Sequence, residues 1–120
     1  MSFPADILTL RVADLTLDLI SRRVTRAGVE LQLRPREIDV LAYMIWHRNR
    51  PIPAVELRER VWSLRFDPET NRVQVHISRL RDAMDRHFDQ RLIHTISPAP
   101  GRRAYFFTED PNTLHAWGNA

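Results

Sequence analysis

Basic and acidic side chains are sorted onto opposite sides of residues 71–86, NRVQVHISRLRDAMDR. At about 100° per helical residue, Arg72, His76 and Arg79 share one flank, while Asp82 and Asp85 fall on the other, together with Arg81. Guanidinium and imidazole groups aligned in this way can bind a polyanion such as a phosphate backbone. A solvated amphipathic helix with scattered charges is the alternative interpretation of the same pattern.

The apolar residues of this stretch predict how the helix is positioned. Val73, Ile77, Leu80 and Met84 recur at i, i+4, i+7 and i+11, which is the spacing of one helical stripe. We expect that stripe to pack on the rest of the domain, which would leave the arginine flank open.

The basic residues of the chain are of a kind that suits a nucleic-acid partner. All 18 basic residues are arginine, and the formal net charge is +3. Arginine grips phosphate and guanine edges with a planar fork of donors that lysine lacks. A GC-rich genome would also enrich arginine, so the composition alone leaves both explanations open.

Several other classes of function are disfavoured. The chain has no cysteine, which excludes disulfides, zinc–thiolate sites and thiol catalysis within it. The histidines lack a paired-ligand spacing, and there is no nucleophile elbow or glycine-rich phosphate loop, so we expect no enzyme, cofactor or metal site. No apolar run approaches the roughly 20 residues of a membrane span, and no signal peptide is evident, so we expect a cytoplasmic protein that does not contact membranes.

The remaining patterns predict one α+β domain over residues 8–107, after a lead at 1–7 and before a flexible tail at 108–120. Residues 8–33 alternate apolar and polar side chains with breaks at 13–14 and 27–28, which predicts a four-stranded antiparallel sheet. Three helices follow. The first begins at Pro35 with a buried stripe, the second begins near Pro53, and the third is 71–86. The predicted stripe of the first helix comprises Ile38, Leu41, Ala42, Ile45 and Trp46.

A β-hairpin is predicted to close the domain. RLIHTIS and AYFFT read as strands, and PAPGRR reads as the polar loop between them. Arg102 and Arg103 at its tip could contact a phosphate backbone or a minor groove. Alternatively, they keep an exposed sheet edge soluble.

The motifs LRPREIDVL, VELRERVW, FDPETN, VQVHISRLR and LIHTI lie on these elements in order. Together they resemble the effector domain of OmpR/PhoB-type bacterial response regulators, a winged helix-turn-helix. The resemblance covers residues 8–107.

The resemblance implies roles for individual residues. Helix 71–86 would enter the major groove through Arg72, Val75, His76 and Arg79, with Arg79 as base reader. Arg81 matches a position used for phosphate contact or internal pairing, and Thr95 and Ser97 match positions that contact the backbone and the minor groove. The loop 63–71 matches a segment that contacts RNA polymerase, with Arg65, Phe66, Asp67 and Glu69 as candidates.

The chain also departs from the family pattern. Gln74 replaces an acidic residue, a basic residue is absent near Ala83, and Ser97 replaces the wing arginine. The wing, 97–104, is longer and richer in proline than usual. We therefore expect Arg102 or Arg103 to supply the missing charge.

These patterns predict sequence-specific binding to double-stranded DNA in bacterial transcription regulation. Head-to-tail pairs would occupy direct repeats, as the resemblance implies for homodimers on DNA. A winged-helix protein-interaction module that has lost DNA reading is the alternative. The phospho-acceptor receiver domain of two-component regulators is not found within these residues, which predicts either an excised effector domain or a receiverless regulator.

Overall fold

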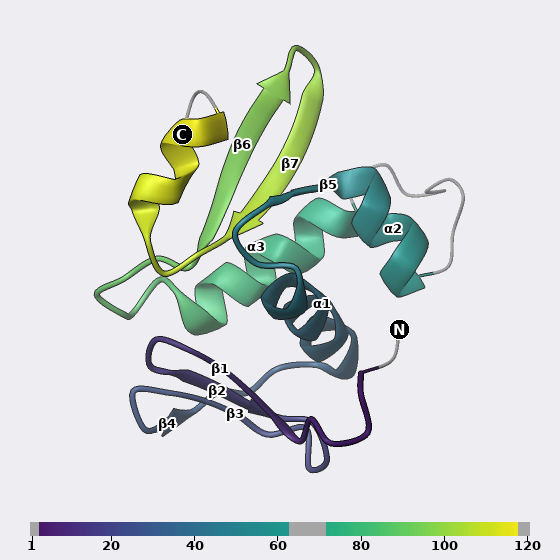
Figure 1. Cartoon of the computed structure of the whole chain (residues 1–120). Coiled ribbons are helices and arrows are strands. Elements are labelled where there is room, and N and C mark those ends of the chain that lie inside the picture. The colour runs from purple at the N-terminus through teal and green to yellow at the C-terminus, as the bar shows by residue number, and fades with distance from the viewer. Residues whose placement is uncertain (1–2, 63–71, 118–120) are drawn as a thin grey trace.

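The computed structural model describes residues 3–62 and 72–117, and in it three helices lie between two antiparallel sheets (Figure 1). The N-terminal sheet packs on one side of the helices, and a long hairpin projects from the other side. The helices are α1 (Pro35–Trp46), α2 (Ala54–Trp62) and α3 (Arg72–Met84). This arrangement confirms the predicted winged helix-turn-helix.

The N-terminal sheet is the predicted four-stranded meander. Its strands, in the order in which they pair, are β1 (Thr9–Val12), β2 (Leu15–Asp18), β3 (Val24–Arg26) and β4 (Val29–Glu30). The reversals fall at the two predicted breaks, with φ of 53° at Ala13, 51° at Ala27 and 79° at Gly28. Every second side chain of β1 to β3 is buried, so one face of the sheet packs on the helices.

Helix α1 is the most deeply buried helix among the described residues. It begins at Pro35, where a missing N–H costs nothing, and the Glu37 carboxylate accepts a hydrogen bond from the Arg34 N–H at 2.9 Å. Its buried surface is wider than the predicted stripe, because Val40, Tyr43 and Met44 are buried too. The assignment of Trp46 to that stripe is wrong. Trp46 ends the helix with 41% of its surface exposed, in edge contact with Phe3.

Helix α3 packs its predicted stripe against the core. Val73, Ile77, Leu80 and Met84 are all buried, and the helix contacts both α1 and α2. Burial of this face is common to both interpretations of the helix, which differ in the role of the charged flank. Because this stripe faces the core, Arg79 on the other side of the helix is directed toward solvent.

The second sheet forms the wing. Its strands are β5 (Pro51–Pro53), β6 (Ile93–Ala99) and β7 (Arg102–Phe107), with β7 in the centre. The predicted loop PAPGRR is mostly strand, because β6 continues through Pro98 and β7 resumes at Arg102. The register shifts between Ile96 and Ala99, and Gly101 turns the chain with φ of 71°.

The segment after the wing differs from the predicted irregular tail. Residues Pro111–Trp117 form a 3₁₀ helix, η1, which lies beside β6 (Figure 1). Leu114 is buried in a small cluster with Ile96, Ala104 and Phe106. This contact covers one face of the wing. None of the helices in the described ranges is long and apolar enough to cross a membrane.

Candidate nucleic-acid interface

The predicted arginine flank of α3 lines a groove of about 430 Å³. Arg79 is exposed, whereas Arg72, Val75 and His76 are half-buried. These four side chains lie together with two that the sequence did not single out: Arg36 from α1 and Trp62 from α2. The predicted surface is therefore one wall of a groove rather than an isolated helix face.

Local contacts orient the side chains of this groove. The His76 ring packs edge-on against Trp62 at 5.0 Å between centroids, and its Nδ1 lies 3.0 Å from the Arg72 carbonyl oxygen. Arg79, by contrast, has no hydrogen bond or ion pair among residues 3–62 and 72–117. Its guanidinium can therefore bind an incoming ligand without first breaking a described contact.

The other flank of α3 faces the wing across a second groove, of about 370 Å³. Its lining includes Gln74 and Ser78 from the helix, and Arg103 and Tyr105 from the wing. The α3 helix thus has one groove on each side. At about 100° per residue, Gln74 and His76 point roughly 160° apart, which places them on opposite grooves.

Arg81 lies at the base of the wing groove and connects helix to hairpin. Its Nη2 donates a hydrogen bond to the Thr95 hydroxyl oxygen at 2.6 Å, and its guanidinium lies 5.8 Å from the Tyr105 ring centroid. Burial lowers the pKa of Arg81 and raises that of Tyr105. Of the two roles left open for Arg81, the structure displays internal pairing, and its partner is the predicted contact residue Thr95.

Three further predicted residues lie along the wing. Ser97 on β6 and Arg102 and Arg103 on β7 are all exposed. They lie near the tip, whereas Thr95 lies closer to α3. The structure therefore brings the helix residues into one groove and spreads the wing residues along a projecting arm.

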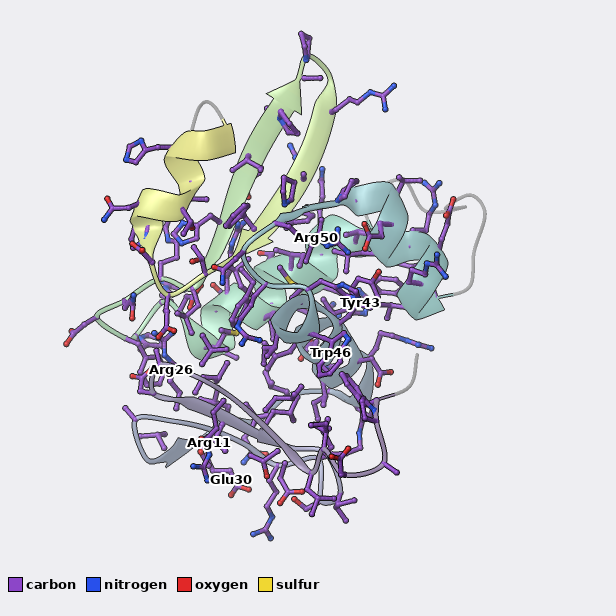
Figure 2. All side chains as sticks on the ribbon, in the orientation of Figure 1. Arg11, Arg26, Glu30, Tyr43, Trp46 and Arg50 are labelled. Atoms are coloured by element: carbon purple, nitrogen blue, oxygen red, sulfur yellow. The ribbon has the colours of Figure 1, made fainter. Side chains whose placement is uncertain are left out.

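A buried arginine anchors α3 to the N-terminal sheet (Figure 2). Arg26 has no exposed surface, and its guanidinium contacts Asp14 at 3.0 Å and Asp85 at 2.8 Å. It also donates to the carbonyl oxygens of Met84 and Gln90. Each nitrogen of its guanidinium has a partner, so this cation serves the fold.

Asp85 links Arg26 to the start of the wing. Its carboxylate accepts hydrogen bonds from the backbone N–H groups of Leu92 and Ile93, at 3.1 Å and 3.0 Å. Those residues lead into β6. One buried ion pair therefore fixes the sheet, the end of α3 and the start of the wing relative to one another.

A second polar cluster joins α1 to α2. Arg50 contacts both carboxylate oxygens of Glu56, at 3.0 Å and 2.6 Å, and the Tyr43 hydroxyl donates to the same carboxylate (Figure 2). Burial would raise the pKa of Glu56, but hydrogen bonds from Arg50 and Tyr43 lower it overall. Burial and the Glu56 contact raise the pKa of Tyr43 to about 12. This cluster holds the helix pair beside the α3 groove.

The predicted RNA polymerase contacts Arg65, Phe66, Asp67 and Glu69 lie outside the described residues. Arg36 and Trp62 were missed because neither has a local signal. Arg36 reads as an ordinary first-turn residue, and Trp62 as an apolar residue of its own helix. Only the packing of α1, α2 and α3 brings both to the predicted flank.

Comparisons with known proteins agree with this geometry. The family model described as "Transcriptional regulatory protein, C terminal" matches residues 28–99. The transcriptional regulatory protein CusR of Escherichia coli K12 is 37% identical over 86 residues, covering 72% of this chain and 38% of CusR. TrcR of Mycobacterium tuberculosis is 39% identical over 93 residues, covering 78% of this chain and 35% of TrcR.

Solved structures share the fold. The DNA-binding domain of CpxR from E. coli has a TM-score of 0.70 at 25% identity, over 85% of this chain and 98% of that one. The DNA-binding domain of Klebsiella pneumoniae RstA, at 24% identity, has a TM-score of 0.72 over 85% of this chain and 98% of that one. The chain spans well under half the length of the curated relatives it matches. By sequence and by fold, this chain belongs to the family of C-terminal domains of transcriptional regulatory proteins, alongside OmpR/PhoB-type response regulators.

Proposed function

We propose that this domain binds double-stranded DNA sequence-specifically and thereby regulates transcription. The observation that carries the proposal is the asymmetry of α3. Its apolar stripe is buried, while Arg79 on the opposite side is exposed and has no partner among the described residues. An α-helix presented in this way fits a major groove about 12 Å wide.

In this proposal, α3 reads the bases. Arg79 donates two hydrogen bonds to a guanine edge, and Val75 contacts a thymine methyl group. Arg72 and His76, which line the same groove, contact the bases or the phosphates beside them. Each well-formed arginine–guanine pair would contribute about 1–3 kcal/mol of discrimination against a wrong base.

The wing supplies contacts to the DNA backbone. Arg102 and Arg103 are exposed near the hairpin tip and would contact phosphates or the minor groove, with Ser97 beside them. Arg81 and Thr95 contribute by holding the wing to α3 through their hydrogen bond. Arg103 also lines the groove between α3 and the wing. This position beside α3 supports a DNA contact over a role limited to keeping the sheet edge soluble.

Selection of bound fragments from a random DNA pool tests the proposal. We expect enrichment of one motif, and saturable binding of that motif which weakens as salt increases from about 50 to 200 mM. The spacing of repeated half-sites would show whether molecules bind in tandem. If no motif is enriched and no salt-sensitive binding occurs at micromolar protein, the interaction-module alternative is favoured.

Two finer proposals extend this function to partners. We propose that molecules bind direct repeats as head-to-tail pairs in the bacterial cytoplasm, and that the loop 63–71 contacts RNA polymerase. Both rest on the family resemblance. A template bearing two half-sites, compared with one bearing a single half-site, tests the first, and transcription in vitro with Asp67→Ala tests the second.

A further inference from the structure

Arg36 belongs to α1, yet it lines the same groove as the proposed reading residues of α3. The described lining of that groove comprises Arg36, Trp62, Arg72, Val75, His76 and Arg79, and none of these six carries a carboxylate. The Arg36 side chain is 46% exposed. A second helix therefore adds a cation to the edge of the α3 surface.

The guanidinium of Arg36 is held in place without being saturated. Its Nη1 donates to the Val61 carbonyl oxygen at 2.9 Å, near the end of α2, and its central carbon lies 5.9 Å from the Trp62 ring centroid. Asp39 is 3.5 Å away but also binds Arg22, at 2.7 Å. A guanidinium has five N–H donors, so several stay open to a ligand.

The position of the wing indicates which ligand group Arg36 would meet. The wing residues Thr95, Arg103 and Tyr105 border the groove on the other flank of α3. A helix in the major groove has one phosphate strand along each of its sides. If the wing meets one strand, the flank that carries Arg36 faces the other.

We propose that Arg36 contacts a DNA phosphate on the strand opposite the one contacted by the wing. This inference rests on the proposed function. The cation–π contact with Trp62 and the hydrogen bond to Val61 preorganise the guanidinium, so little side-chain entropy is lost when the phosphate binds. The contact would strengthen binding to any duplex and carry no sequence information of its own.

The test measures DNA affinity by fluorescence anisotropy at several KCl concentrations, on the selected duplex and on an unrelated duplex of equal length. Arg36→Gln removes the charge while keeping an amide that can donate to Val61. The salt slope is the slope of the logarithm of the binding constant against the logarithm of the salt concentration. We expect its magnitude to fall by about 0.9, the value for one phosphate contact, on both duplexes. Arg36→Lys, which keeps the charge, should retain most of the slope.

Arg23→Ala is the matched control. Arg23 lies outside the DNA-facing elements, its side chain is 76% exposed, and it lies 3.5 Å from Glu30. The variant changes the net charge by the same amount but should leave the salt slope at its wild-type value. Thermal melting of each free protein distinguishes unfolding from a specific weakening of DNA binding.

Ethylation interference locates the phosphate. Ethylation on either strand should block binding of the wild-type protein. Arg36→Gln should lose sensitivity at one phosphate of one strand, and Arg103→Ala should lose it at a phosphate of the other strand. An unchanged slope and pattern for Arg36→Gln, with wild type binding normally, would overturn the Arg36 contact alone. Absence of salt-sensitive binding by the wild type would overturn the proposed function, and the contact with it.

Discussion

Arg26 and Arg79 have the same side chain, but they lie in opposite kinds of environment. Arg26 has no exposed surface and is surrounded by two carboxylates and two carbonyl oxygens. Arg79 is exposed and has no partner in the described part of the chain. The comparison indicates that the number of acceptors around an arginine, more than its charge, decides whether it maintains the fold or binds a ligand.

Removal of the Arg26 side chain should have the largest effect. We expect Arg26→Ala to lower the free energy of unfolding by about 3–5 kcal/mol, because Asp85 would be left buried without its cation. Urea denaturation measures this change. Arg23→Ala, at an exposed site, should stay within about 0.5 kcal/mol of wild type. A decrease below about 1 kcal/mol for Arg26→Ala would contradict the assignment of a structural role.

Arg79→Ala should weaken base discrimination and leave the stability of the fold nearly unchanged. We expect discrimination at one base position of the selected motif to fall by about 1–3 kcal/mol, while the free energy of unfolding changes by less than about 0.5 kcal/mol. Binding to motif variants and urea denaturation measure the two quantities on the same protein. Equal weakening on every sequence would instead identify Arg79 as a phosphate contact.

Substitution of the wing arginines should have a smaller effect on DNA binding, again without an effect on stability. We expect the double variant Arg102→Ala/Arg103→Ala to lower the salt slope by about 0.9 for each phosphate that these side chains neutralise, with stability unchanged. Titrations at several salt concentrations measure the slope. If affinity and slope both remain at wild-type values, the wing arginines have no part in DNA binding and serve the solubility of the hairpin.

The smallest expected effect concerns pH. Burial, together with Arg91 and Arg81 and against the influence of Asp85, lowers the pKa of His94 below its ordinary value of 6.5. The unfolded chain therefore binds a proton more readily than the folded one, so this contribution to stability is complete above pH 6.5 and declines as the pH falls below it.

Thermal melting between about pH 7.5 and about pH 5.5 measures the effect of His94. We expect the melting temperature to decrease on acidification, and His94→Gln to reduce part of that decrease. An unchanged pH dependence in His94→Gln would assign the effect to other groups, such as His47, whose pKa burial also lowers.

Local periodicity accounts for what the sequence predicted well. The α3 stripe and the alternation in β1 to β3 are repeated signals within a few residues of one another, and both are confirmed. Such patterns specify which side of an element is buried. The same patterns placed Arg79 on the exposed side of α3, whereas Arg72, Val75 and His76 of that flank are half-buried.

The features that local sequence patterns did not indicate depend on contacts between residues far apart in the chain. Arg26 follows Val24 by two positions and so points into the core, but its partner Asp85 lies 59 residues away. Arg36 and Trp62 meet α3 only after three helices have packed. At the wing, Pro98 suggested a loop, yet an edge strand tolerates a residue without an N–H group.

Pro98 also affects how readily copies of this domain can associate through β6. Strand β6 is an outer strand of its sheet, and an unpaired outer strand is a template onto which another polypeptide can add. Pro98 removes one backbone donor from this strand, and the register shift between Ile96 and Ala99 interrupts the repeat that a foreign strand would need. The hairpin can thus project from the domain with less tendency to nucleate intermolecular β-sheet.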